Sequence, residues 1–524
     1  MMAKKSSTRA GRVADGLLIS YPLLRFAVLL VLTTTTFVWI FHLVQDLRPF
    51  SRRESSPDEV YLLSQIETFV QESANQPVLP LDSAEMGHRL RSLLGWVQLA
   101  ESLDEQKDAS NLSQQLWNQS ERLAASHLPF LQHETLSRPL WTTLHSHGPK
   151  TKGIVIPVGN TNFHLACHLI SNIREVLSSK APIQIAYSGD QDLSSDRRDF
   201  IIKRWPKIEL LDVLTELDDQ TIRLNTTGYS IKPFAALVSR FEQTILVETD
   251  AIFLKKPEIV FEEPGYKDTG VLLFKDRSVF AGHDRFREEW WQMQLQDLEP
   301  LSDNFMRSRA YLEGFSEHGE SGVVVLDKSR IDVQMALLHT CWQNTFDARE
   351  YTYMFANGDK ESFWFGMEAL ATPYAMEKDY AAALGHECQE GNTHEKRICT
   401  TNIAHLDHQG QLLWYNGGLY HDKSASERVF SSIPNAWMVN GNWSTADPGS
   451  FSSMTGSQHH PLTTHEYEII FKTLERATSI DSTLKERNMI APPSEPPTEP
   501  PTEPPTETPT QSSAAPPYEI STSI

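Results

Sequence analysis

The sequence predicts an α/β protein with an open, mostly parallel sheet flanked by helices. The first observation is a change at residue 152, after which continuous apolar strands alternate with helical patterns, as in buried parallel sheets. The second is spacing: strands are expected at residues 153–158, 183–187, 208–213 and 244–253, with a helix at 163–178. Ligands of such sheets bind at the carboxyl ends of the strands, so functional residues are expected there.

The N-terminal segment predicts a membrane anchor. Residues 26–44 form an apolar run without a charge, close to the roughly 20 residues that span a bilayer. Basic residues exceed acidic ones in residues 1–25, and no small-residue cleavage site follows the run. We expect a cytoplasmic tail, a type II signal-anchor and a lumenal remainder.

The lumenal part divides by composition. Residues 45–150 show apolar residues at helical spacing and predict a stem or helical cap between the membrane and the body. Residues 151–480 carry the strand and helix alternation and predict the catalytic domain. Residues 490–524 are rich in Pro, Thr and Glu, cannot bury a core and are expected to be disordered.

The net charge and the cysteine content limit which classes of partner and which cellular compartment are expected for the protein. A net charge of −21 argues against a nucleic-acid partner, because phosphate binding needs basic patches. Cys388 and Cys399 lie close enough in the chain for a small lumenal disulfide, Cys167 reads as a buried thiol, and Cys341 could be either. Usable glycosylation sequons begin at Asn111, Asn118, Asn225 and Asn442.

The strongest functional signal lies in the strand expected at 244–253. It carries Glu248 and Asp250, and side chains two apart on an extended segment point the same way. The two carboxylates could converge on Mn²⁺ or Mg²⁺, which prefer oxygen ligands and often share them with substrate phosphates. The other interpretation is an acidic turn that closes a core strand.

Several blocks together resemble the fungal Golgi α-1,3-mannosyltransferase family. The resemblance covers about residues 150–420 and depends on the order and spacing of the blocks. They are Thr151-Lys-Gly-Ile-Val-Ile-Pro-Val158, Tyr229-Ser-Ile-Lys-Pro-Phe-Ala-Ala236, the carboxylate strand, Glu320-Ser-Gly-Val-Val-Val-Leu-Asp-Lys328, Gly358-Asp-Lys-Glu-Ser-Phe-Trp-Phe-Gly366 and the stretch from His405 to Gly418.

The resemblance implies a GT-A fold, a metal ion, and retaining transfer of mannose from GDP-mannose to a mannosylated glycan or glycoprotein. The family's carboxylate strand normally reads Asp-x-Asp, whereas this chain has Glu248-Thr-Asp250. By resemblance Asp250 binds the metal directly and Glu248 helps to hold the nucleotide. A late His often completes such a metal site, which points to His405, with His408 as a weaker candidate.

The remaining candidate residues are expected to contact the sugar, the acceptor or the phosphates of the donor. Asp359 and Glu361 are predicted as the catalytic carboxylates that contact the sugar or acceptor, with Lys360 near a phosphate and Trp364 in the sugar site. An alternative is a helix N-terminus, where the dipole favours acids and the aromatics fill the core. Two further substrate contacts are predicted: Glu320 on the acceptor side and Lys232 facing the diphosphate, although a Lys before Pro is more often a surface residue.

Two mechanisms and three functions stay open at this point. Retention allows either front-face attack by the acceptor hydroxyl or a covalent carboxylate intermediate. The chain is an active mannosyltransferase, a related transferase with another donor or linkage, or an inactive lumenal homologue that binds glycan or GDP. Glu248 in place of Asp supports the third. An aspartyl-nucleophile phosphohydrolase is disfavoured because its Asp-x-Asp-x-Thr pattern is absent.

Overall fold

The computed structural model describes residues 57–105, 111–132, 151–224, 228–279, 285–315, 317–388, 396–422, 428–444, 452–456 and 458–490. The predicted cytoplasmic tail, signal-anchor and Pro-rich tail lie outside the described residues. Within the described ranges, none of the helices has the length and apolar character needed to cross a membrane.

The centre of the molecule is a seven-stranded sheet with the order β3-β2-β1-β4-β7-β6-β8. Strands β1 to β4 pair in parallel, β7 runs antiparallel to β4 and β6, and β8 is parallel to β6. The predicted mostly parallel α/β sheet is therefore confirmed. The strands are β1 Lys152–Pro157, β2 Ile183–Tyr187, β3 Ile208–Asp212, β4 Gln243–Val247, β6 Val271–Lys275, β7 Gly319–Asp327 and β8 Ala375–Met376.

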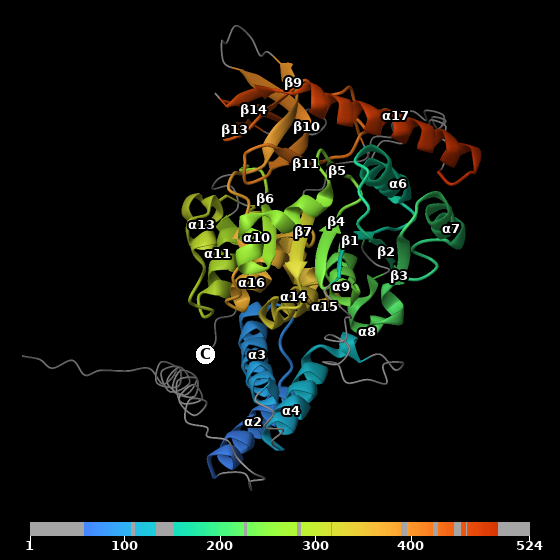
Figure 1. Ribbon diagram of the computed structural model, residues 1–524. Helices are drawn as coiled ribbons and strands as arrows, with labels where there is room; N and C mark the ends of the chain where they lie inside the picture. The colour runs from blue at the N-terminus through green and yellow to red at the C-terminus, as the bar shows by residue number, and fades with distance from the viewer. Residues whose placement is uncertain are drawn as a thin grey trace, which may run out of the picture.

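Alternating side chains of the sheet enter two separate cores. Leu246 of β4 faces a core with helices α9, α14 and α16, while its neighbours Ile245 and Val247 face a core with α6 and α7. The sheet is therefore covered on both faces (Figure 1). The helices around it are α6 Phe163–Ser171, the π-helical turn η2 Asn172–Val176, α7 Ser195–Arg204, η3 Val213–Thr215, α8 Asp219–Ile222, α9 Ile231–Val238, η5 Pro257–Glu262, α10 Pro264–Thr269, α14 Ile331–Gln343, α15 Phe346–Phe355 and α16 Lys360–Ala369.

A second, largely antiparallel sheet adjoins the carboxyl end of β4. It has the order β13-β14-β10-β9-β12-β15, and β11 bridges β10 to β5, the strand that follows β4 in the chain. The disulfide predicted between Cys388 and Cys399 is present here, and Cys167 and Cys341 are buried free thiols. The strands are β5 Ala251–Phe253, β9 Ala382–Cys388, β10 Arg397–Leu406, β11 Leu412–Asn416, β12 Ala436–Met438, β13 Asn442–Ser444, β14 Ser452–Thr455 and β15 His459–Pro461.

The last helix belongs to the body as well. Helix α17, Thr464–Glu486, lies across the second sheet and packs on α6. Its residue Ile480, together with Ile490 after the helix, is buried in the core on that side of the central sheet. The folded part therefore continues about ten residues beyond the predicted boundary at 480.

The N-terminal helices are α2 Pro57–Asn75, α3 Ser83–Glu105, α4 Asn111–His127 and the short η1 Pro129–Leu131. Residues 45–150 were predicted to form a stem or helical cap, and the helices described in this segment share one hydrophobic core with α9, α14 and α16. Polar contacts reinforce the packing: His339 Nε2 lies 3.0 Å from the carbonyl oxygen of Ser83, and Gln294 Oε1 accepts the Ser83 N–H at 2.9 Å. The helices are part of the body rather than a spacer below it.

Arg91 of α3 is the clearest single link between these helices and the body. Its guanidinium donates to the carbonyl oxygens of Leu298 at 2.6 Å, Ala369 at 2.7 Å and Glu368 at 3.2 Å. The carbonyls of Glu368 and Ala369 end α16, and that of Leu298 lies between two members of a second group of helices, α11 Arg285–Leu295, α12 Asp303–Met306 and α13 Arg309–Glu313.

We predict that Arg91→Ala lowers the free energy of unfolding by roughly 2–4 kcal/mol, because several carbonyls lose a charged donor. The measurement is urea unfolding of the full chain. Arg122→Ala is the control, since Arg122 is exposed and donates only to Gln119 on its own helix. If both variants fall within about 0.5 kcal/mol of the parent, the helices are not integral to the body.

Candidate functional site

The predicted carboxylate strand is interrupted where the carboxylates occur. Strand β4 ends at Val247 and β5 begins at Ala251, so Glu248 and Asp250 lie on a turn rather than on an extended segment. The Ala251 N–H donates to the Glu248 carbonyl at 3.2 Å, and the Glu248 N–H donates to Gly322 of β7 at 2.9 Å. The turn is fixed to the start of β7 at the junction of the two sheets.

Lys232 holds this junction together. It sits in the first turn of α9, and its ammonium contacts Glu248 Oε1 at 2.6 Å, Asp359 Oδ1 at 2.7 Å and Ser321 Oγ at 2.7 Å. Burial alone would lower the Lys232 pKa, but Asp359 and Glu248 raise it above its ordinary value. The alternative of a surface lysine is therefore wrong, because Lys232 is 4% exposed and binds carboxylates, and its predicted contact with the diphosphate stays a prediction.

Asp359 enters the site from the N-terminus of α16. Gly358 before it has a φ of 75°, a conformation that suits glycine, and a Cβ there would meet the ring of Tyr229 at 3.3 Å. Asp359 is 1% exposed; burial raises its pKa to about 6, against the opposing effect of Lys232. Its second oxygen, Oδ2, has no hydrogen-bond partner. The structure thus brings Asp359 to Lys232 and Glu248 and leaves one oxygen available.

Lys360 points into a different network. Its ammonium pairs with Asp276 Oδ2 at 2.6 Å and Glu317 Oε1 at 3.0 Å. Burial would lower the Lys360 pKa, yet Asp276 and Glu317 raise it overall, and the Asp276 pKa is lowered because Lys360 outweighs its burial. Lys360, predicted near a phosphate, is instead an ion-pair partner of two protein carboxylates.

Glu361 fastens α16 to the start of β7. It accepts the N–H groups of His318 at 3.0 Å and Gly319 at 3.2 Å, and also the indole N–H of Trp364. Burial raises its pKa to about 7, opposed by Lys360. Both oxygens are occupied by protein donors, so the structure gives Glu361 a positioning role instead of the predicted catalytic one. Trp364 is 1% exposed, which places it in the core.

Glu320, a residue of β7, lies beside Glu248. Its Oε1 accepts the Gly322 N–H at 2.7 Å and the Asn416 side-chain N–H at 2.9 Å, and the same Asn416 nitrogen lies 3.3 Å from Glu248 Oε2. Burial raises the Glu320 pKa to about 7, and the charges of Asp276 and Glu248 add to the effect. Glu320 is thus connected through Asn416 to the group formed by Lys232, Glu248, Asp359 and Ser321, which is called the Lys232 network below. The predicted contact of Glu320 with the acceptor stays a prediction.

His405 occupies a buried aromatic setting on β10. It is fully buried, stacks on Trp414 with 4.2 Å between ring centroids, and has Nδ1 2.7 Å from Glu377 Oε2. Nε2 has no hydrogen-bond partner. An Nδ1–H held by a carboxylate and an unpartnered Nε2 is the usual state of a metal-binding imidazole. His408 instead pairs with Glu263 at 3.0 Å on the turn after β10.

The fit to a metal ion is partial. No group of three or more His, Cys, Asp or Glu side chains in the described ranges is arranged to hold an ion. Asp250 and His405 have suitable donor atoms, but they are not neighbours in the second sheet: His405 lies opposite Trp414, which lies opposite Phe253, three residues after Asp250. Their role as metal ligands stays a prediction, in which a substrate supplies the remaining ligands.

Sequence reasoning missed several members of the site. Ser321, Asn416, Asp276 and Glu377 each bind one of the predicted residues, and Asp276 and Glu377 occur in no pattern that marks them in advance. For two of them a signal was available. Ser321 follows Glu320 directly, and Asn416 opens the Asn-Gly-Gly sequence of the last resembling block.

Comparison with known proteins bears on this site directly. A family model described as "Mannosyltransferase putative" matches residues 151–407, which include every site residue predicted above except the weaker candidate His408. The chain is 24% identical to the α-1,3-mannosyltransferase MNN1 of Saccharomyces cerevisiae over 347 residues, 56% of this chain and 44% of that protein. It is 28% identical to the α-1,3-mannosyltransferase MNT2 of the same yeast over 311 residues, 53% of each.

The comparisons confirm the predicted resemblance to fungal α-1,3-mannosyltransferases. The chain spans about half the length of the curated relatives it matches. Among solved structures, the mannosyltransferase Ktr4p from S. cerevisiae in complex with GDP matches 44% of this chain and 68% of that chain. Its identity of 12% and TM-score of 0.30 are too low to bear on the fold.

We predict that Glu320→Gln makes the protein more stable at high pH. The Glu320 pKa rises from 4.5 to about 7 on folding, so its contribution to stability is present below pH 4.5 and lost as the pH rises through 7. Glutamine keeps the accepting oxygen and removes the charge. The variant should match the parent near pH 4 and exceed it by roughly 3 kcal/mol above pH 7.

Urea unfolding at a series of pH values measures this difference. Glu475→Gln, on the exposed face of α17, is the control and should follow the parent at every pH. A Glu320→Gln profile parallel to the parent profile would contradict the assigned burial of the charge.

Proposed function

We propose that the chain is an active retaining glycosyltransferase that moves mannose from GDP-mannose to a mannoside and forms an α-1,3 linkage. The family supports the activity and the linkage. The arrangement of a parallel sheet with carboxylates at the end of β4 supports a GT-A type of fold. The acceptor is a mannosylated glycan or glycoprotein.

The observation that carries the proposal is a set of buried polar atoms that lack partners around the Lys232 network. They are Asp359 Oδ2, Asn416 Oδ1 and His405 Nε2. Buried polar groups are normally satisfied, and leaving one unsatisfied costs about 1–3 kcal/mol. All three can accept a hydrogen bond or bind a cation, so a ligand rich in hydroxyl groups together with a cation would satisfy them.

The residues of the network have distinct roles in this proposal. Lys232 holds Glu248 and Asp359 in place without any rearrangement during the reaction. Asp359 Oδ2 is the oxygen that orients the acceptor hydroxyl. As the bond between that hydroxyl oxygen and the anomeric carbon forms, the anomeric carbon–phosphate oxygen bond breaks, its electron pair leaves with GDP, and the hydroxyl proton passes to the leaving phosphate oxygen.

A divalent cation, Mn²⁺ or Mg²⁺, would be held by Asp250 together with the substrate diphosphate, and His405 is the candidate for a further ligand. When bound, it neutralises charge on the leaving diphosphate. Glu377 keeps the imidazole in the tautomer that leaves Nε2 free, and Glu248 adds negative charge nearby while bound to Lys232.

The cellular setting is part of the same proposal. Residues 26–44 would anchor the protein in the Golgi membrane as a single-pass type II protein. The disulfide between Cys388 and Cys399 supports an oxidising compartment for the body.

We predict that the purified full chain releases GDP from GDP-mannose in the presence of Mn²⁺ and an α-linked mannobiose. EDTA should abolish the release, and Asp250→Asn should lower it roughly 100-fold or more through loss of charge stabilisation. Release is measured with a coupled GDP assay, and the linkage by methylation analysis of the product.

Asp199→Asn provides the control, because Asp199 is an exposed residue of α7 that pairs with Lys203. Near-normal transfer by folded Asp250→Asn would show that the metal assignment is wrong. If the parent binds GDP-mannose without releasing GDP to any mannoside, the inactive glycan-binding homologue is the better description. Turnover of a different sugar nucleotide would identify a related transferase.

A further inference from the structure

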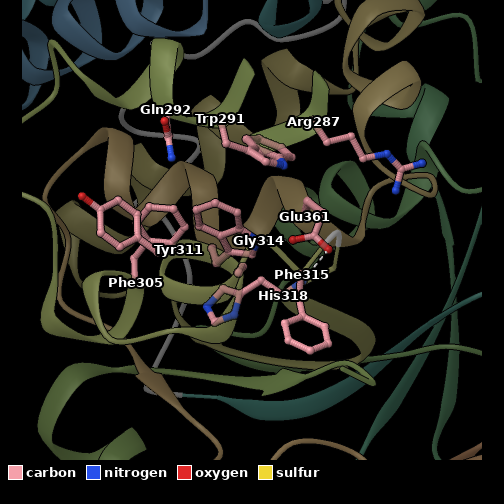
Figure 2. Close-up of a pocket in the computed structure, with 11 residues that line it drawn as sticks. Arg287, Trp291, Gln292, Phe305, Tyr311, Gly314, Phe315, His318 and Glu361 are labelled. Atoms are coloured by element: carbon pink, nitrogen blue, oxygen red, sulfur yellow. Dashed lines mark hydrogen bonds between the residues drawn. The ribbon is translucent and has the colours of Figure 1, made fainter. Parts of the chain in front are cut away.

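A small aromatic hollow lies next to the site around Lys232, Glu248 and Asp359, which is called the catalytic edge below. The hollow takes no part in the proposed reaction. It is bounded by α11, α12, α13, the segment before β7 and the first turns of α16. Figure 2 shows its lining, in which the rings of Phe305, Tyr311 and Phe315 surround that of His318. The cavity volume is about 20 Å³, which is enough for one water-sized group.

His318 is the polar group at the base of this hollow. It is 1% exposed, and neither of its ring nitrogens has a hydrogen-bond partner. Burial lowers its pKa to about 3, assisted by the charge of Lys275, so the ring is neutral. A neutral imidazole has one donor and one acceptor, and leaving both buried without partners is costly. A hydroxyl group, which also donates and accepts, is the matching ligand group.

The walls of the hollow suit the apolar face of a sugar ring. Phe305 stacks on Trp364 with 4.8 Å between centroids and 15° between planes, so this wall is rigid. Tyr311 and Phe315 are half-buried at the mouth, where ring atoms remain accessible. Aromatic faces beside a few convergent polar groups are typical of small-molecule sites, and Tyr combines an apolar body with a polar end.

The hollow is joined to the catalytic edge by a single helical turn. Glu361 lines the hollow and accepts the His318 N–H, while Asp359, two residues earlier, binds Lys232. The hollow and the Lys232 network therefore lie on the two sides of the first turn of α16, and one glycan would have to reach around this turn to contact both.

We propose that this hollow is an acceptor subsite: it binds a sugar residue of the glycan adjacent to the one that is extended. A hydroxyl or hydroxymethyl group of that residue enters the hollow and bonds to His318, and its ring lies against Tyr311 and Phe315. The inference rests on the proposed function, because it assumes a mannoside acceptor.

The test is binding of α-linked mannobiose and of methyl α-mannoside to the full chain, measured by calorimetry in the presence of GDP and Mn²⁺. His318→Phe keeps the ring shape and removes both nitrogens. We expect mannobiose to bind about tenfold more weakly to the variant, and methyl mannoside to bind unchanged. Tyr311→Ala, at the mouth, should have the same effect. Tyr467→Ala, an exposed tyrosine of α17, is the control and should leave both affinities unchanged.

A thermal melt separates this role from a structural one. His318→Phe removes unsatisfied buried nitrogens, so its melting temperature should equal or exceed that of the parent while mannobiose binding falls. Unchanged mannobiose binding in both His318→Phe and Tyr311→Ala would overturn the inference, as would a parent that binds no mannobiose. Selective binding without GDP release from GDP-mannose would support the subsite and contradict only the proposed catalysis.

Discussion

The site depends on one buried ammonium group. Lys232 contacts Glu248, Asp359 and Ser321, each within 2.7 Å, and these acceptors come from three separate elements of the chain. Without a cation at this point, the buried carboxylate of Asp359 and the partly exposed carboxylate of Glu248 would repel each other where the sheet ends. An unpaired buried charge costs several kcal/mol, whereas a fully bonded pair is tolerated. The positions of the β4 turn, the β7 start and the α16 N-terminus therefore depend on one another.

The first turn of α16 distributes this constraint through the site. Asp359, Lys360 and Glu361 are consecutive, and each enters a different network: Asp359 binds Lys232, Lys360 binds Asp276, and Glu361 binds the backbone that leads into β7. Consecutive residues of a helix point about 100° apart, which explains how one short motif can join several elements. The predicted alternative of a helix N-terminus with aromatics in the core thus describes this motif well, and a role for Asp359 in catalysis is compatible with it.

The positions of the first strands could be predicted from the sequence, whereas the burial of the charged side chains of the site could not. Apolar runs separated by helical segments predicted β1, β2 and β3 to within one or two residues, since strand periodicity and length are local properties. The break between Glu248 and Asp250 was missed because both flanking segments are apolar and the turn is held by Gly322, far away in the chain. The contacts of Lys232 with carboxylates were not predicted because its partners Asp359 and Ser321 are about 90–130 residues away.

Lys232→Met isolates the contribution of the buried ammonium group, because methionine keeps much of the stem of the side chain and removes the charge. Hydrogen–deuterium exchange of the full chain reports on the β4 turn, the β7 start and the α16 N-terminus separately. We expect protection to fall at all of these segments together while α2 to α4 stay protected, and GDP-mannose binding to be lost. A folded variant with unchanged protection at the three segments and normal GDP-mannose binding would contradict this role of Lys232.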